Sequence, residues 1–159
     1  MKKWIVCLLA IVVSGFTVFA QDGKKEHKGK DYDQVIAADQ VPPVIQNFIQ
    51  DYLEGQPIIK AKLQSNNVYE IDLADGIEVK FHSDGEWHHI ESDNNKPLSK
   101  VVLGLLPTDI LNYLNANYKG VAVSEISKCT QGYEVEVETT PKSKDLMFTP
   151  DGKFLKAED

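Results

Sequence analysis

The chain has 159 residues, and its 17 basic residues, all of them lysine, are outnumbered by 24 Asp and Glu residues, which gives a formal net charge of −7. Proteins that bind DNA, RNA or phosphate groups generally present a basic surface and use the planar guanidinium group of arginine, so this composition argues against all three ligands. The hydrophobic fraction of 42% is typical of a folded globular chain, and the length suits one domain or two very small ones.

Residues 1–20 have the pattern of a secretory signal peptide. Lys2 and Lys3 precede a nearly continuous apolar run over residues 4–19, and Ala20 ends a cleavage pattern of small residues. The alternative is a membrane anchor, but this run of roughly 16 residues is shorter than the ~20 that span a bilayer. We therefore expect cleavage after Ala20, a periplasmic or secreted product, and no membrane span in the mature chain. Its net charge is −9, from 15 basic and 24 acidic residues.

Residues 21–34 are rich in lysine and acidic groups and contain almost no apolar side chains, which predicts a flexible polar tether. The net negative charge therefore belongs to residues 35–159. Cys129 is the only cysteine after cleavage, so an internal disulfide is excluded and we expect a buried apolar side chain at this position.

The rest of the chain repeats itself. Residues 41–49 align with residues 106–114 at an offset of 65 positions, and residues 68–73 align with residues 132–137 at an offset of 64. The aromatic and Asp-Gly positions of residues 81–87 recur in residues 148–154 at an offset of 67. Insertions in loops produce such small changes of offset. We divide the chain into a first repeat (35–91), a linker (92–104) and a second repeat (105–159).

Each repeat opens with a predicted amphipathic helix. Pro42 and Pro107 suit the first helical turn, where a missing amide costs no hydrogen bond, and Gly55 and Gly120 suit the ends of the helices. The apolar side chains follow a period of 3.6 residues. They are Val41, Val44, Ile45, Phe48, Ile49, Tyr52 and Leu53 in the first repeat, and Leu106, Ile110, Tyr113, Leu114 and Tyr118 in the second.

Four strands are predicted after each helix. They span residues 58–65, 68–73, 77–82 and 86–91 in the first repeat, and 121–129, 133–139, 145–149 and 153–157 in the second. Asp-Gly sequences at 75–76, 84–85 and 151–152 fit three-residue hairpin loops that end in glycine. These loops predict five apolar pairs: Leu73 with Ile77, Ile71 with Val79, Tyr69 with Phe81, Phe81 with Trp87, and Phe148 with Phe154.

The predicted fold class is α+β, with two tandem repeats that each pack one amphipathic helix on a four-stranded antiparallel sheet. A unit of about 50 residues buries too little surface to be comfortably stable alone. The two repeats are therefore expected to pack together or to continue one sheet. The helices cover one face of the sheet, and the other face is left to solvent.

The same residues carry a family resemblance. A Leu/Val-Pro pair, an amphipathic helix, a glycine, a Tyr-Glu strand and a Phe-x-x-Asp-Gly-x-aromatic hairpin resemble the PepSY-like domain, also called β-lactamase-inhibitor-like, of bacterial periplasmic proteins. The pattern is matched over about 41–91 and again over 106–158, and residues 68–87 are its most specific stretch. The second copy departs from it at residues 140–144, where Thr-Pro-Lys-Ser-Lys replaces the Asp-Gly turn. The resemblance implies two tandem copies, a periplasmic location and no catalytic residues, and it suggests enzyme inhibition by analogy of fold alone.

Three histidines lie near one another in the first repeat. The predicted register pairs Lys80 with His88 and places His82 diagonally beside His88 on the outward face. Two imidazoles with Glu86 nearby suit a transition metal, whereas Lys80 between them repels a cation. The alternative is a solvated, pH-responsive surface that also includes His89. His82 and His88 are the candidate metal ligands, and no cofactor is predicted.

Acidic residues alternate with apolar ones in the strands, which places them on the face away from the helices. They are Glu70, Asp72, Glu78, Glu134, Glu136 and Glu138. They form either a solvated polar face or a surface whose negative field attracts a basic envelope protein or peptide. The sequence contains no nucleophile triad or nucleotide motif, so we predict a non-enzymatic binding or inhibitor-like module. The alternative is an envelope protein that handles a small ligand or metal through outward histidines, and the oligomeric state is left open.

Overall fold

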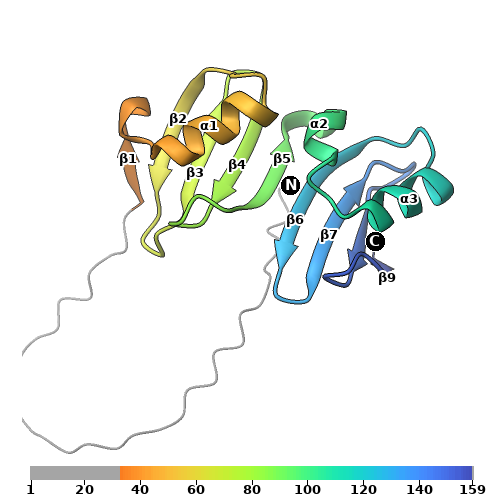
Figure 1. Cartoon of the computed structure of the whole chain (residues 1–159). Helices are drawn as coiled ribbons and strands as arrows, with labels where there is room; N and C mark the ends of the chain where they lie inside the picture. Colours follow the sequence, from red (N-terminus) through yellow and green to blue (C-terminus); the bar gives the residue numbers. More distant parts are fainter. Residues whose placement is uncertain (1–32, 159) are drawn as a thin grey trace, which may run out of the picture.

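A nine-stranded antiparallel sheet organises residues 33–158, the part of the chain that the computed structural model describes (Figure 1). The strands follow one another in chain order. They are β1 (Gln34–Ile36), β2 (Ile58–Leu63), β3 (Tyr69–Leu73), β4 (Ile77–Phe81), β5 (Trp87–Ser92), β6 (Val123–Cys129), β7 (Gly132–Val137), β8 (Lys144–Phe148) and β9 (Phe154–Glu158). The predicted signal peptide and most of the predicted tether lie outside the described residues.

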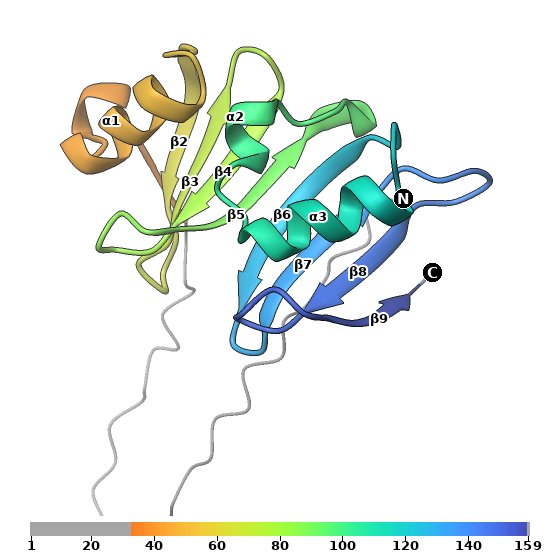
Figure 2. The same ribbon diagram turned by 45° about the vertical axis from the view of Figure 1, so that its right-hand side comes forward.

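The helices lie on one face of this sheet, and the opposite face is uncovered (Figures 1 and 2). Within residues 33–158 there are three α-helices, α1 (Pro43–Tyr52), α2 (Lys100–Leu103) and α3 (Thr108–Asn117), and two 3₁₀ turns, η1 (Ala38–Gln40) and η2 (Asp93–Asn95). α1 buries Ile45 and Ile49, and α3 buries Ile110 and Leu114, as their period predicts. Among the described residues, no helix is both long and apolar enough to cross a membrane.

The structure confirms four of the five predicted apolar pairs. Tyr69 pairs with Phe81 and Ile71 with Val79 across β3 and β4, and Phe81 pairs with Trp87 across β4 and β5. In the second repeat, Phe148 and Phe154 pair across β8 and β9. The glycines at positions 76, 85 and 152 have φ angles of +88°, +87° and +84°, the left-handed conformation that these tight turns require.

The predicted fold class, with two repeats that each have a helix on a separate four-stranded sheet, is wrong. β5 pairs with β6, which joins the strands of both repeats into one sheet, and β1 adds a ninth strand at its edge. Ile90 and Ile126 face each other at this junction, and both are 0% exposed. Separate sheets would expose these side chains and the unpaired backbone groups of two strand edges to water. One buried apolar cluster instead extends beneath all three helices.

Two elements lie outside the predictions. β1 begins at the last residue of the predicted tether, and α2 lies within the predicted linker. β1 has three residues and α2 has four, and segments this short show no hydrophobic period that distinguishes them from loops. Cys129 at the end of β6 is a free thiol and is partly buried, not fully buried as predicted.

Candidate functional site on the open face of the sheet

Seven carboxylates form a continuous row across the uncovered face of the sheet. Each lies directly opposite the next on a neighbouring strand. From β3 to β9 they are Asp72, Glu78, Glu91, Glu125, Glu136, Asp145 and Glu158, and we call them the acidic row. Side chains that face each other on adjacent strands have Cβ atoms roughly 5 Å apart. The row therefore concentrates like charge along a line perpendicular to the strands.

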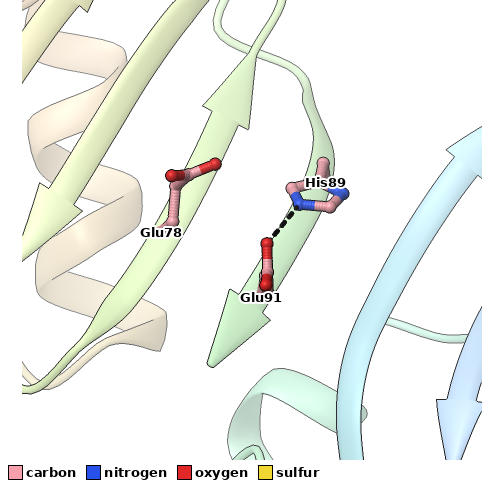
Figure 3. Close-up of side chains that lie close together, drawn as sticks. All are labelled: Glu78, His89 and Glu91. Atoms are coloured by element: carbon pink, nitrogen blue, oxygen red, sulfur yellow. Dashed lines mark ion pairs between the residues drawn. The ribbon is translucent and has the colours of Figure 1, made fainter. Parts of the chain in front are cut away.

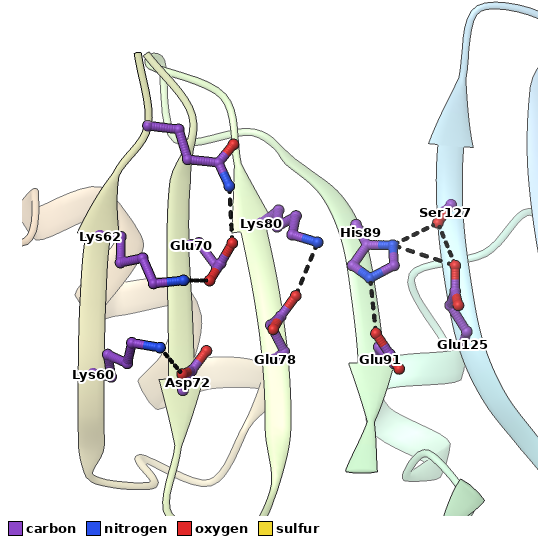
Figure 4. Close-up of polar contacts among 11 residues, drawn as sticks. Lys60, Lys62, Glu70, Asp72, Glu78, Lys80, His89, Glu91, Glu125 and Ser127 are labelled. Atoms are coloured by element: carbon purple, nitrogen blue, oxygen red, sulfur yellow. Dashed lines mark hydrogen bonds and ion pairs between the residues drawn. The ribbon is translucent and has the colours of Figure 1, made fainter. Parts of the chain in front are cut away.

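A second row runs beside it and has a different composition. From β2 to β9 its members are Lys62, Glu70, Lys80, His89, Ser127, Glu134, Met147 and Lys156. We call this the mixed row. Lys62 pairs with Glu70 between β2 and β3, and Gln64 donates a hydrogen bond of 2.8 Å to the same carboxylate (Figure 4). Charge is thus compensated near the N-terminal edge of the sheet.

Lysines also reach the first two members of the acidic row. Lys60 Nζ lies 3.5 Å from an Asp72 oxygen, and Lys80 Nζ lies 2.9 Å from Glu78 Oε1 (Figure 4). On β5 and β6 neither row contains a lysine. His89 and Ser127 occupy the mixed row on these strands, and Glu91 and Glu125 occupy the acidic row. Lys156 of β9 likewise pairs with Glu158, the last member of the acidic row. The negative field is therefore strongest over the central strands.

The predicted acidic residues are distributed over three places. Asp72, Glu78 and Glu136 belong to the acidic row, whereas Glu70 and Glu134 belong to the mixed row. Glu138 follows β7 at one end of the sheet, where it accepts hydrogen bonds from Ser124 Oγ at 2.5 Å and Asn95 Nδ2 at 2.8 Å.

Four members of the acidic row were missed by the sequence analysis. They are Glu91, Glu125, Asp145 and Glu158. Alternation with apolar residues in β6 and β8 was the available signal for Glu125 and Asp145. Their alignment into one row depends on the pairing of β5 with β6, which no local pattern specifies.

Carboxylates surround Glu134 at the centre of the second half of the sheet. Its side chain is largely covered, with 7% of the residue exposed. Burial, followed by the charges of Asp145, Glu125 and Glu158, raises the pKa of Glu134 from 4.5 to about 7. Burial is also the main reason why the pKa of Glu136 is raised. At both residues the charges of nearby carboxylates add to the effect of burial on the pKa.

His89 lies between the lysines and the carboxylates. Its Nδ1 is 2.9 Å from Ser127 Oγ and 3.3 Å from Glu125 Oε1, and its Nε2 is 3.5 Å from Glu91 Oε2 (Figure 4). Burial alone would lower the pKa of His89, but the contacts with Glu125 and Glu91 outweigh burial and raise it from 6.5 to about 9. His89 is therefore a cationic member of this face at neutral pH when no other cation competes for its ring nitrogen.

The predicted pairing of Lys80 with His88 is wrong. A β-bulge between Lys80 and Phe81 adds one residue to β5, so that Lys80 pairs with His89 instead. His88 stacks on His82 with ring centroids 4.4 Å apart, so these two predicted metal ligands are close together. Burial, together with positive charge on His82, His89 and Lys80, lowers the pKa of His88 from 6.5 to about 4.

Glu86, expected beside the histidines, pairs with Lys128 at 3.2 Å. Lys128 also lies over the Trp87 ring, 4.4 Å from its centroid. Glu86, Trp87 and Lys128 line a groove of about 470 Å³ on the helix side of the sheet. Phe48 and Tyr52 of α1 also line this groove. This groove and the acidic row are on opposite faces, so they are separate features.

A family model described as "Putative beta-lactamase-inhibitor-like, PepSY-like" matches residues 67–156. This match covers more than half of the chain and contains all strands from β3 onward except the last two residues of β9. The chain belongs to the PepSY-like family. The match runs through both predicted repeats as one segment, so it does not by itself divide them into two family copies. Among curated proteins, none matches the chain.

Three solved structures of similar proteins have the same fold. A "putative periplasmic protein of unknown function" from Bacteroides vulgatus is 28% identical, with a TM-score of 0.71 over 80% of this chain and 100% of the other. A "putative calcium-regulated periplasmic protein" from Bacteroides thetaiotaomicron is 23% identical, with a TM-score of 0.68 over 80% of this chain and 97% of the other. A second "putative periplasmic protein" from Bacteroides vulgatus is 21% identical and has a TM-score of 0.67 over 82% and 100% of the two chains. The latter two are similar to this PepSY-like protein in fold.

Proposed function

We propose that this protein is a non-enzymatic binding module of the bacterial periplasm and that the acidic row binds a cationic segment of an envelope protein or peptide. The observation that carries the proposal is the direct opposition of like charges on six successive strand pairs. Like charges that face each other in a sheet are destabilising. A positively charged partner would neutralise them and gain affinity from the same field.

The dimensions of the acidic row favour an extended peptide. Neighbouring strands are about 4.8 Å apart, so six steps make the row roughly 29 Å long. An extended chain rises about 3.3 Å per residue, which means that about nine residues span this distance. A helix would need about 19 residues for the same span. A short strand-like segment with several lysines or arginines is therefore the simplest occupant.

The periplasmic part of the proposal is supported by the related structures, whose descriptions place them in that compartment. Residues 1–20 would act as the signal peptide and be cleaved after Ala20. Two tandem copies of the family unit, over residues 35–91 and 105–159, would explain the sequence repeat, and α3 begins 65 residues after α1. In this proposal both copies contribute strands to the surface that binds the partner.

The binding of a labelled nine-residue peptide with alternating lysines tests this function. Fluorescence anisotropy should show saturable binding that weakens as the salt concentration rises, because the attraction is electrostatic. The variant Glu136→Lys/Asp145→Lys/Glu158→Lys reverses three adjacent charges of the acidic row and should abolish binding. Only the Glu136→Lys change faces a remaining carboxylate, Glu125, whereas the other new lysines face one another across β7, β8 and β9. Far-UV circular dichroism must therefore show that the variant is folded before its loss of binding is counted.

The matched control is Asp51→Lys/Glu54→Lys/Asp109→Lys. It changes the net charge by the same amount but alters exposed residues on the helix side of the protein. Binding should weaken only slightly in this variant. Equal losses in both triple variants would show that the peptide responds to net charge and not to the acidic row, and the proposal would be abandoned.

A further inference from the structure

We propose that His89, Glu91 and Glu78 form a binding site for zinc or a similar divalent transition-metal ion. The three side chains come from the adjacent strands β4 and β5 and turn toward one another on the open face (Figure 3). One potential ligand atom from each lies within 4.8 Å of the other two. Imidazole nitrogen and carboxylate oxygen are both zinc ligands, and a site with three protein ligands leaves the fourth position open.

The separation of two ligand atoms fits a metal better than it fits a direct hydrogen bond. His89 Nε2 lies 3.5 Å from Glu91 Oε2, and this buried nitrogen has no hydrogen-bond partner. Zinc binds nitrogen and oxygen ligands at about 2.0–2.2 Å, so neighbouring ligands of a tetrahedral site are about 3.3–3.5 Å apart. The observed distance therefore matches one edge of such a site.

The other nitrogen of the ring is oriented as in established metal sites. Ser127 donates its hydroxyl hydrogen to Glu125 Oε1 at 3.1 Å, so the Ser127 oxygen accepts a hydrogen bond from His89 Nδ1 at 2.9 Å. This arrangement places a hydrogen on Nδ1. The second proton of the cationic ring is on Nε2, and a metal ion must displace it before the Nε2 lone pair can bind. A metal-bound histidine usually donates its second N–H to a carboxylate or a similar acceptor, which fixes the ring.

The presence of imidazole decides the class of metal. Calcium and magnesium prefer oxygen ligands, whereas imidazole suits zinc and its neighbours in the transition series. A second cluster on this face, made by Glu70, Asp72 and Glu78, offers oxygen atoms alone. It is also paired with Lys60, Lys62 and Lys80. The histidine cluster is therefore the better candidate.

Lys80 is the competitor for this site. Its ammonium group is 2.9 Å from Glu78 Oε1, so the metal must displace it or use the other oxygen of that carboxylate. Removing this lysine should therefore strengthen metal binding. The inference goes beyond the proposed peptide-binding function and does not depend on it, since the test uses the metal alone.

Isothermal titration of the purified protein with Zn²⁺ tests the site. One equivalent should bind to the wild type, His89→Ala should reduce the affinity at least 100-fold, and Glu91→Gln should reduce it at least tenfold, because each variant removes a ligand. Ser127→Ala should reduce it on the order of tenfold by freeing the ring. Lys80→Met should bind several times more tightly than the wild type, an effect that a loss of folding cannot imitate.

The matched control is His82→Ala/His88→Ala, which removes the neighbouring pair of stacked imidazoles and should leave the affinity unchanged. In ¹⁵N-histidine-labelled protein, Zn²⁺ should shift the Nε2 signal of His89 and leave those of His82 and His88 in place. The proposal is overturned if the wild type does not bind Zn²⁺, if binding disappears only in the control variant, or if Ca²⁺ binds equally well.

Discussion

Replacement of Glu134 by glutamine should stabilise the protein at neutral and alkaline pH and leave its stability nearly unchanged in acid. Glutamine has the shape of a protonated glutamic acid but carries no charge at any pH. Glu134 is 7% exposed, and the pKa of its carboxyl is raised from 4.5 to about 7, first by burial and then by three nearby carboxylates. The substitution removes the cost of keeping this buried group ionised.

The sign and the size of the effect follow from proton binding. In the unfolded chain the carboxyl releases its proton near pH 4.5, whereas in the folded protein it keeps the proton until about pH 7. Between these values the folded state binds more protons, so the free energy of unfolding of the wild type falls as the pH rises. Each tenfold change in proton affinity corresponds to roughly 1.4 kcal/mol. The full difference is therefore about 3 kcal/mol, reached above pH 7.

Two histidines make a direct comparison with the variant necessary. His88, with its pKa lowered to about 4, makes the wild type more stable as the pH rises from about 4 to 6.5. His89, with its pKa raised to about 9, makes it less stable between about 6.5 and 9. Both contributions are common to the wild type and to Glu134→Gln, so they largely cancel in the difference between the two proteins.

Urea denaturation followed by far-UV circular dichroism, repeated from pH 4.5 to pH 9, measures this difference. It should rise across pH 4.5–7 and then level off. The control Glu54→Gln removes an exposed carboxylate on the helix side and should give a small difference that does not depend on pH. A flat profile for Glu134→Gln would refute the reasoning, since it would mean that Glu134 ionises as easily in the folded protein as in the unfolded chain.

Two further predictions concern the fold. Gly85→Ala and Gly120→Ala both place a side chain at positive φ, at a cost of about 1 kcal/mol, but only at Gly85 does the new Cβ meet an atom, Val44 Cγ1 at 2.4 Å. Gly85→Ala should therefore lower the free energy of unfolding by roughly 1–3 kcal/mol more than Gly120→Ala does, and equal urea midpoints would contradict this packing. Ile71→Ala should cost about 2–5 kcal/mol because the side chain is 0% exposed. Amide exchange in β7 should accelerate as much as in β3 if the joined sheet unfolds as one unit, and protection retained in β7 alone would contradict this.

The local parts of the fold were predictable from the sequence because turns set the register between neighbouring strands. An Asp-Gly turn of fixed length pairs Tyr69 with Phe81 and Phe148 with Phe154, and the structure has both pairs. The β-bulge at His88 has no such signal, because the extra residue is not a glycine. One added residue moves His89 opposite Lys80 and brings Glu91 opposite Glu78. The proposed zinc ligands were therefore hidden from the sequence analysis.

The pairing of β5 with β6 is the second feature that local patterns do not specify. Thirty residues, including α2 and α3, lie between the end of β5 and the start of β6. The periodicity of β5 and of β6 shows which side chains face the core. It does not show which strand pairs with β5 or with β6. In the folded protein Ile90 lies opposite Ile126, and the same register aligns Glu91 with Glu125.

The mixed row and the acidic row differ in the charges of their cross-strand neighbours. In the mixed row, Glu70 lies between Lys62 and Lys80, an arrangement in which each cross-strand neighbour is stabilising. In the acidic row, every cross-strand neighbour from Asp72 to Glu158 is another acid. Each like-charged pair costs a few tenths of a kcal/mol to about 1 kcal/mol. Lysines pair with three members of the acidic row, Asp72, Glu78 and Glu158, but not from opposite positions within the row. The direct opposition of acids is therefore not explained by stability, and a cationic ligand would recover energy that it costs the folded protein.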